Sequence, residues 1–162
     1  MRRIPLALVL VSSISLAAPR YELDGNQLKV PHPVIFESGK PALKPEAAEA
    51  ISYVRGYLDD KPYVSLLRVE VHSDSTGTEK FNQVLSEQRA LAVAKALVAQ
   101  GIDCKRLIAV GFGSTKPVAD NSTPEGKAQN RRTVFANVQL RGRNIGGQPS
   151  DGGGHVAGDP CH

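Results

Sequence analysis

The sequence predicts an α/β (α+β) fold, a two-layer sandwich with a mixed β-sheet and two main helices on one face. Apolar residues recur at helical period in two long segments, 45–60 and 78–100. Apolar runs of strand length precede, separate and follow these segments. The expected order is therefore strand, helix, strand, helix, strand, loop, strand (βαβαβ-β).

The first 17 residues are expected to form a secretory signal peptide. Arg2 and Arg3 precede an apolar run over residues 4–16, and Ser15-Leu16-Ala17 resembles a cleavage site. The run is shorter than the roughly 20 residues of a membrane-spanning helix, although an uncleaved anchor remains an alternative. The sequence has no cysteine near the expected cleavage site, so nothing there indicates a lipid anchor. These features predict export to the periplasm, with outer-membrane association left open.

Charge and cysteine content limit the function classes. The chain of 162 residues suits one domain, and its formal charge is +4. Without Arg2 and Arg3, 18 basic residues face 16 acidic ones, which is too small an excess to predict nucleic-acid binding. Cys104 and Cys161 match no metal-site spacing. In an oxidising compartment they form either a disulfide within the chain or a link between chains.

Residues 21–30 predict an N-terminal hairpin or edge strand around Asp24-Gly25-Asn26, and residues 34–36 a short strand. Pro45 suits the first turn of a helix that ends before Lys61-Pro62. Its apolar face comprises Ala47, Ala48, Ile51, Val54, Tyr57 and Leu58.

Residues 64–72 predict a central strand, and the second helix follows over residues 78–100. Gly101 suits a left-handed helix end. The helix face expected to pack on the sheet comprises Val84, Leu91, Ala94 and Val98, with Leu85 and Leu97 beside it.

The last third of the chain predicts strands at 107–112 and 133–140, with a short helical turn at 124–128 between them. From Gly142 onward the chain is rich in glycine and nearly free of apolar residues, which predicts a disordered tail over 142–162. The folded domain is thus expected at residues 18–141.

The stretch from Val69 to Ala90 carries the candidate binding site. A strand leads into a small polar turn that opens a helix, and unpaired N–H groups at a helix start favour anions. The turn supplies the carboxylate of Asp74, and the helix supplies the guanidinium of Arg89 about four turns later. If both flank one groove, they grip a ligand that carries an ammonium and a carboxylate.

Several short blocks stand in a fixed order along the chain. They are Phe36-Glu37-Ser38-Gly39, His72-Ser73-Asp74 with Gly77, Asn82 with Leu85-Ser86 and Arg89-Ala90, Gly111-Phe112-Gly113, and Asn130-Arg131-Arg132. This pattern resembles the OmpA-like C-terminal (peptidoglycan-binding) domain family, as in outer-membrane protein A and the peptidoglycan-associated lipoprotein. The resemblance covers roughly residues 34–140.

The resemblance implies non-covalent binding of peptidoglycan through the diaminopimelate of its stem peptide. Asp74 takes the ammonium and Arg89 the carboxylate, which a planar guanidinium matches as a fork. Asn82 and the backbone of Thr76 and Gly77 complete the pocket. The resemblance also implies a protein without enzymatic activity or cofactor, whose partners are peptidoglycan and other envelope proteins.

Two details of the pattern leave alternatives. One arginine of the pair Arg131 and Arg132 is expected to lie against the groove while the other braces the loop; Arg131 is taken as the ligand contact. Val71 and Ser73 replace the Gly and Thr of the family pattern, so the backbone approach beside the turn differs.

Two other functions compete with the binding hypothesis. His72 beside Asp74 allows a small metal-dependent hydrolase, but a metal site needs three or four converging ligands, and a histidine that supports the turn is the favoured interpretation. The third hypothesis is a scaffold with a vestigial groove, in which the glycine-rich tail or the first hairpin recruits a protein partner.

Overall fold

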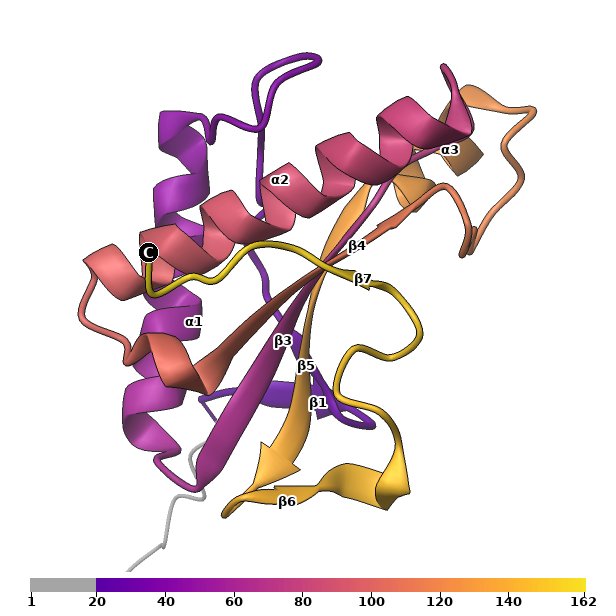
Figure 1. Cartoon of the computed structure of the whole chain (residues 1–162). Coiled ribbons are helices and arrows are strands. Elements are labelled where there is room, and N and C mark those ends of the chain that lie inside the picture. The colour runs from indigo at the N-terminus through magenta and orange to yellow at the C-terminus, as the bar shows by residue number, and fades with distance from the viewer. Residues whose placement is uncertain (1–19) are drawn as a thin grey trace, which may run out of the picture.

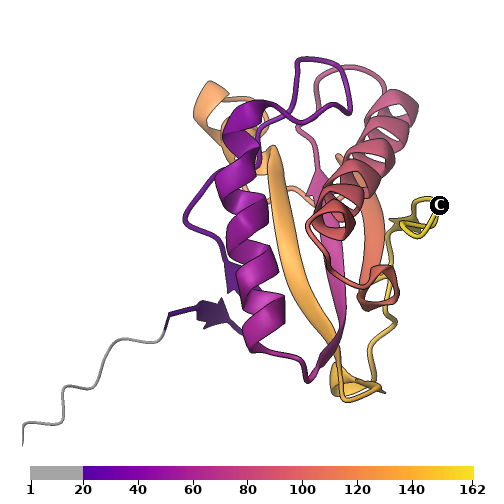
Figure 2. The same ribbon diagram turned by 90° about the vertical axis from the view of Figure 1, so that its left-hand side faces the viewer.

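The computed structural model describes residues 20–162; the expected signal peptide lies outside the described residues. Within them, a seven-stranded sheet has the order β1-β2-β5-β3-β4-β7, with β6 paired to β5. Two long helices, α1 (Ala48–Asp60) and α2 (Glu79–Ala99), lie on one face of the sheet (Figures 1 and 2). The predicted two-layer α/β fold is confirmed.

β3 (Val64–His72) forms the centre of the sheet, as predicted. It pairs in parallel with β4 (Leu107–Gly113) and antiparallel with β5 (Arg132–Leu140), which makes the sheet mixed. α2 provides the crossover that a parallel pair requires. The chain leaves the helix through Gly101, whose φ of 98° is left-handed. The 3-10 turns η1 (Pro45–Ala47) and η2 (Cys104–Arg106) precede α1 and β4 respectively.

The N-terminal hairpin extends one edge of the sheet. β1 (Glu22–Asp24) and β2 (Gln27–Lys29) pair antiparallel around Gly25, whose φ is 58°. β2 then pairs with β5.

The short strand predicted at residues 34–36 is wrong. Within this segment the structure contains only an isolated bridge between Phe36 and Leu43. Pro31 and Pro33 precede the run, and because proline has no N–H, the segment is a poor continuation of a hydrogen-bonded ladder. Its apolar side chains instead pack against the edge of the core.

α2 packs mainly on β4 and β3, and its buried face overlaps the predicted face only in part. Ala94 and Leu97 are buried as predicted, and Leu91 and Val98 pack partly buried against the core. Val84 is 44% exposed. Asn82 and Ser86 are buried because their side chains hydrogen-bond to neighbouring backbone groups. Two polar residues therefore belong to the buried face of the helix, which the sequence pattern predicted to contain apolar residues only. The buried residues of the helix are Asn82, Ser86, Ala90, Val93, Ala94 and Leu97.

Residues 142–162, which we name the C-terminal strap, are not the predicted disordered tail. β6 (Arg143–Asn144) pairs with β5, β7 (His155–Val156) pairs with β4, and η3 (Ile145–Gly147) lies between them. The strap runs along the sheet face opposite the helices before it rounds the β4 edge (Figure 1). A disulfide joins Cys104 to Cys161 within the chain. Backbone pairing and this cross-link replace the apolar burial that the strap lacks.

A short helix, α3 (Pro124–Asn130), lies in the long loop before β5, where a helical turn was expected. Between residues 20 and 162, no helix has the length and apolar character needed to cross a bilayer.

Candidate functional site

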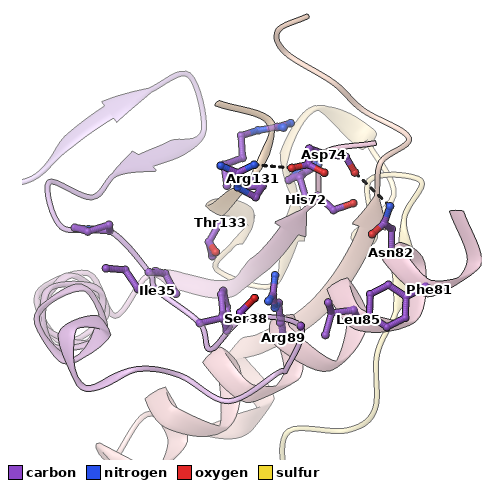
Figure 3. Close-up of a pocket in the computed structure, with 16 residues that line it drawn as sticks. Ile35, Ser38, His72, Asp74, Phe81, Asn82, Leu85, Arg89, Arg131 and Thr133 are labelled. Carbon is purple, nitrogen blue, oxygen red and sulfur yellow. Dashed lines mark hydrogen bonds and ion pairs between the residues drawn. The ribbon is translucent and has the colours of Figure 1, made fainter. Parts of the chain in front are cut away.

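A cleft of about 550 Å³ opens at the end of the sheet where β3 finishes and β5 begins. Its walls are the first turns of α2, the turn after β3, and the segment 33–39 (Figure 3). Four charged side chains line it, namely Asp74, Arg89, Arg131 and Arg132.

Asp74 is held in the turn between β3 and α2 by local hydrogen bonds. Its Oδ1 accepts the Thr76 N–H at 2.7 Å, a bond typical of aspartate in turns. Asn82 Nδ2 donates to the carbonyl oxygens of Asp74 (3.3 Å) and Thr76 (2.9 Å). Gly77 follows with a φ of 85°, and Thr78 caps α2. The carboxylate is thus fixed in place, with Asp74 only 7% exposed.

Arg131 lies across the cleft from this turn, between α3 and β5. Its Nη1 donates to Oδ2 of Asp74 at 2.5 Å (Figure 3). Burial raises the pKa of Asp74, but the Thr76 N–H and the Arg131 guanidinium together lower the pKa by more, so that it lies below its ordinary value. Asp74 is therefore an anion at neutral pH.

Arg89 projects from α2 into the same cleft (Figure 3). Its Nε donates to Lys40 O at 3.0 Å, and its Nη2 donates to Glu37 O at 3.1 Å. The guanidinium lies over the Phe36 ring, with 4.8 Å between Cζ and the ring centroid. Burial lowers the pKa of Arg89, but arginine starts so high that the side chain stays charged. The two bonds leave Nη1 and the second Nη2 proton as donors.

His72, at the end of β3, is a buried residue of the cleft lining, and its ring packs against the sheet. Its ring stacks on Phe112 at a centroid distance of 4.8 Å, and its Nε2 lies 3.2 Å from Glu70 Oε2. Burial, together with the positive charges of Arg132 and Lys116, lowers the pKa of His72 by more than the Glu70 carboxylate raises it. Across residues 20–162, no group of three or more His, Cys, Asp and Glu side chains is placed to hold a metal ion.

The cleft therefore combines a fixed anion with a fixed cation. Such a recess fits a small group that carries both charges, such as a free amino-acid centre. The motif blocks that build it also match a known family: residues 35–131 fit the sequence profile of the OmpA family.

The chain belongs to the OmpA family. The OmpA domain is 44% identical over 105 residues to the probable lipoprotein YiaD of Escherichia coli, a match that covers 65% of this chain and 48% of YiaD. The chain spans about half or less of the length of the first curated relatives that it matches.

Solved structures show the same fold. The cell wall anchor of the T6SS from Pseudomonas aeruginosa is 31% identical with a TM-score of 0.56, and the match covers 62% of this chain and 72% of the anchor. The peptidoglycan-associated lipoprotein from Burkholderia pseudomallei is 28% identical with a TM-score of 0.56, and the match covers 65% of this chain and 86% of the lipoprotein.

Of the six predicted ligand residues, four line the cleft of this OmpA domain: Asp74, Asn82, Arg89 and Arg131. Thr76 and Gly77 do not. The Thr76 N–H is already bonded to Asp74, so it holds the carboxylate instead of facing the cleft. Arg132 braces the loop by donating to Asn130 O and Lys116 O, which leaves Arg131 as the arginine that faces Asp74.

The sequence interpretation missed the apolar wall of the cleft. It comprises Val34, Ile35, Phe36, Phe81 and Leu85, with Pro33 beside them. Phe36 packs against the core, and it also supports the Arg89 guanidinium. The signal was its place in the Phe36–Gly39 block, which the family pattern contains together with the charged residues.

Proposed function

We propose that this domain binds peptidoglycan without covalent chemistry and gains its specificity from the diaminopimelate of the stem peptide. The proposal is supported by its relatives, since one matched structure is a peptidoglycan-associated lipoprotein and another is a cell wall anchor. The activity is anchoring in the bacterial envelope rather than catalysis.

The observation that carries the proposal is that Asp74 and Arg89 line one cleft. The side chain of diaminopimelate ends in a free amino-acid centre, with an ammonium and a carboxylate on the same carbon. In the proposed complex Asp74 accepts from the ammonium, and Arg89 donates to the carboxylate as a planar fork.

Both groups have capacity left for a ligand. A carboxylate offers about four lone-pair sites, and Asp74 uses its two oxygens for Thr76 and Arg131 with one bond each. Arg89 is held by two carbonyl oxygens and the Phe36 ring, so its donors are already oriented before a ligand arrives. A preoriented donor loses little side-chain entropy on binding.

The apolar wall suits the remainder of the same side chain. The methylene groups of diaminopimelate lie between the charged end and the peptide backbone. In the proposed complex they contact Leu85 and Phe36, which line the cleft. An exposed ionic contact contributes only about 0.2–1 kcal/mol, and a buried bidentate one contributes more. With two such contacts, binding of one stem peptide is expected to be weak. A cell-wall polymer presents many such peptides, which raises the overall affinity.

Pull-down on washed sacculi that contain diaminopimelate tests the proposal. The wild-type domain is expected in the pellet, and Asp74→Asn and Arg89→Ala are expected in the supernatant. Asp59→Asn and Arg55→Ala are matched controls, because these residues form an exposed ion pair on α1. If the Asp74→Asn/Arg89→Ala double variant is retained as well as the wild type, the cleft is not the binding site.

A further inference from the structure

The charges that line the cleft do not balance. Three arginines and one aspartate line it, Arg89, Arg131, Arg132 and Asp74, and this leaves an excess of two positive charges. An isolated amino-acid centre has no net charge and does not reduce that excess. A ligand that matches the cleft electrostatically therefore carries more carboxylates than ammonium groups.

The three arginines differ in how they are used. Arg132 donates to two backbone carbonyl oxygens, and Arg89 donates to two others and lies over Phe36. The Arg131 side chain has Asp74 as its one protein partner among residues 20–162, and it is 53% exposed. A guanidinium has five N–H donors, so Arg131 keeps four at the mouth of the cleft.

Resting on the proposed function, we propose that Arg131 forms a second anion site that binds another carboxylate of the stem peptide. The bound ligand is then a net-anionic peptide whose carboxylates are free rather than amidated. Two carboxylates have the required chemistry, namely the α-carboxylate of the D-glutamate next to diaminopimelate and the carboxylate at the peptide C-terminus. In this arrangement Arg131 keeps Nη1 on Asp74 and turns its remaining donors toward the ligand.

A purely structural role for Arg131 makes a different prediction. If Arg131 only holds Asp74 in place, its loss lowers the affinity for the free-acid and the amidated peptides by the same factor. If it binds a ligand carboxylate, its loss lowers only the affinity for the free-acid peptide. The ratio of the two affinities therefore separates the roles, as in a double-mutant cycle.

The experiment measures binding of three synthetic tetrapeptides, L-Ala-γ-D-Glu-diaminopimelate-D-Ala, its D-glutamate α-amide, and its C-terminal amide. For the wild type, one of the amides is expected to bind about threefold to tenfold more weakly than the free acid, and the affected amide identifies the carboxylate. Arg131→Gln is expected to abolish that difference. Arg143→Gln removes the same charge at the far end of β5 and is expected to preserve it.

Equal binding of the three peptides to the wild type overturns the second anion site while leaving the proposed function intact. Persistence of the difference in Arg131→Gln also overturns it. If none of the peptides binds the wild type, the proposed function itself fails. The wild-type comparison needs no variant, so a folding defect in Arg131→Gln does not remove the test.

Discussion

Arg131 Nη1 lies 2.5 Å from Asp74 Oδ2, so the carboxylate of the turn pairs across the cleft and not with Arg89 on the following helix. The two residues are 57 positions apart in the chain. The pair joins the start of β5 to the end of β3, and it leaves Arg89 to be fixed separately by backbone carbonyls. The anion and the cation of the cleft are thus positioned independently of each other.

This pairing sets the acid titration of Asp74. Its pKa lies below the ordinary value of about 3.9. The ionised carboxylate of Asp74 therefore stabilises the folded state fully above the ordinary pKa. This contribution is lost as the pH falls through the lower pKa that Asp74 has in the folded state. Removing Arg131 is expected to raise the pKa of Asp74, as measured by carbon-13 NMR titration of the carboxyl group. An unchanged midpoint in Arg131→Gln would contradict the assigned pair.

Salt is expected to weaken ligand binding because both contacts are ionic. Between about 0.1 M and 1 M salt the Debye length falls from about 10 Å to about 3 Å. Calorimetric titration of the stem tetrapeptide should show affinity falling several-fold over this range. The residual affinity of Asp74→Asn/Arg89→Ala should vary much less. An affinity for the wild type that stays constant with salt would count against the ionic cleft.

The disulfide between Cys104 and Cys161 is expected to contribute strongly to stability. It closes a loop with a sequence separation of 57. The loop-entropy relation for such a separation gives about 4 kcal/mol. Denaturant unfolding with and without reductant measures this contribution. The double variant Cys104→Ser/Cys161→Ser should have the unfolding midpoint of the reduced protein, and reductant should not change it. Identical midpoints for oxidised and reduced wild type would show that the cross-link contributes nothing.

Gly111 allows α2 to approach β4 closely. A Cβ at this position would lie 2.5 Å from the backbone nitrogen of Glu87 and 2.6 Å from Ser86 Oγ. Gly111→Ala is therefore expected to push the helix away and to cost about 1–3 kcal/mol of unfolding free energy. Chemical denaturation gives the value. Wild-type stability in this variant would mean that the helix packs less tightly than the structure indicates.

The strands and helices were largely predictable because their patterns are local. β3 shows apolar residues that largely alternate with polar ones. α2 has a long helical period bounded by Thr78 and Gly101, and the Asp24-Gly25-Asn26 turn indicates a hairpin. The buried polar positions in the first turns of α2 were not predictable, because Asn82 and Ser86 become suitable for burial only when backbone partners lie beside them.

The features that depend on distant parts of the chain were missed or left open. The strap gains its structure from β4, β5 and Cys104, none of which its own glycine-rich composition reveals. The choice between Arg131 and Arg132 depends on how the loop with α3 folds back toward the turn. Spacing along the chain placed Asp74 and Arg89 in one site, but it did not show what holds each of them.

Titration of the domain with free meso-diaminopimelate, followed by amide NMR, tests the central claim most directly. Nα-acetyl-lysine amide is the control, because its α-amine and α-carboxyl are blocked and its side chain ends in an ammonium without a carboxylate. Saturable shifts of the amides in residues 73–82 and of the Arg89 Nε–H signal are expected with diaminopimelate, not with the blocked lysine, and not in Asp74→Asn. Equal shifts with both compounds, or shifts only outside the cleft, would contradict recognition of a zwitterionic side chain by Asp74 and Arg89.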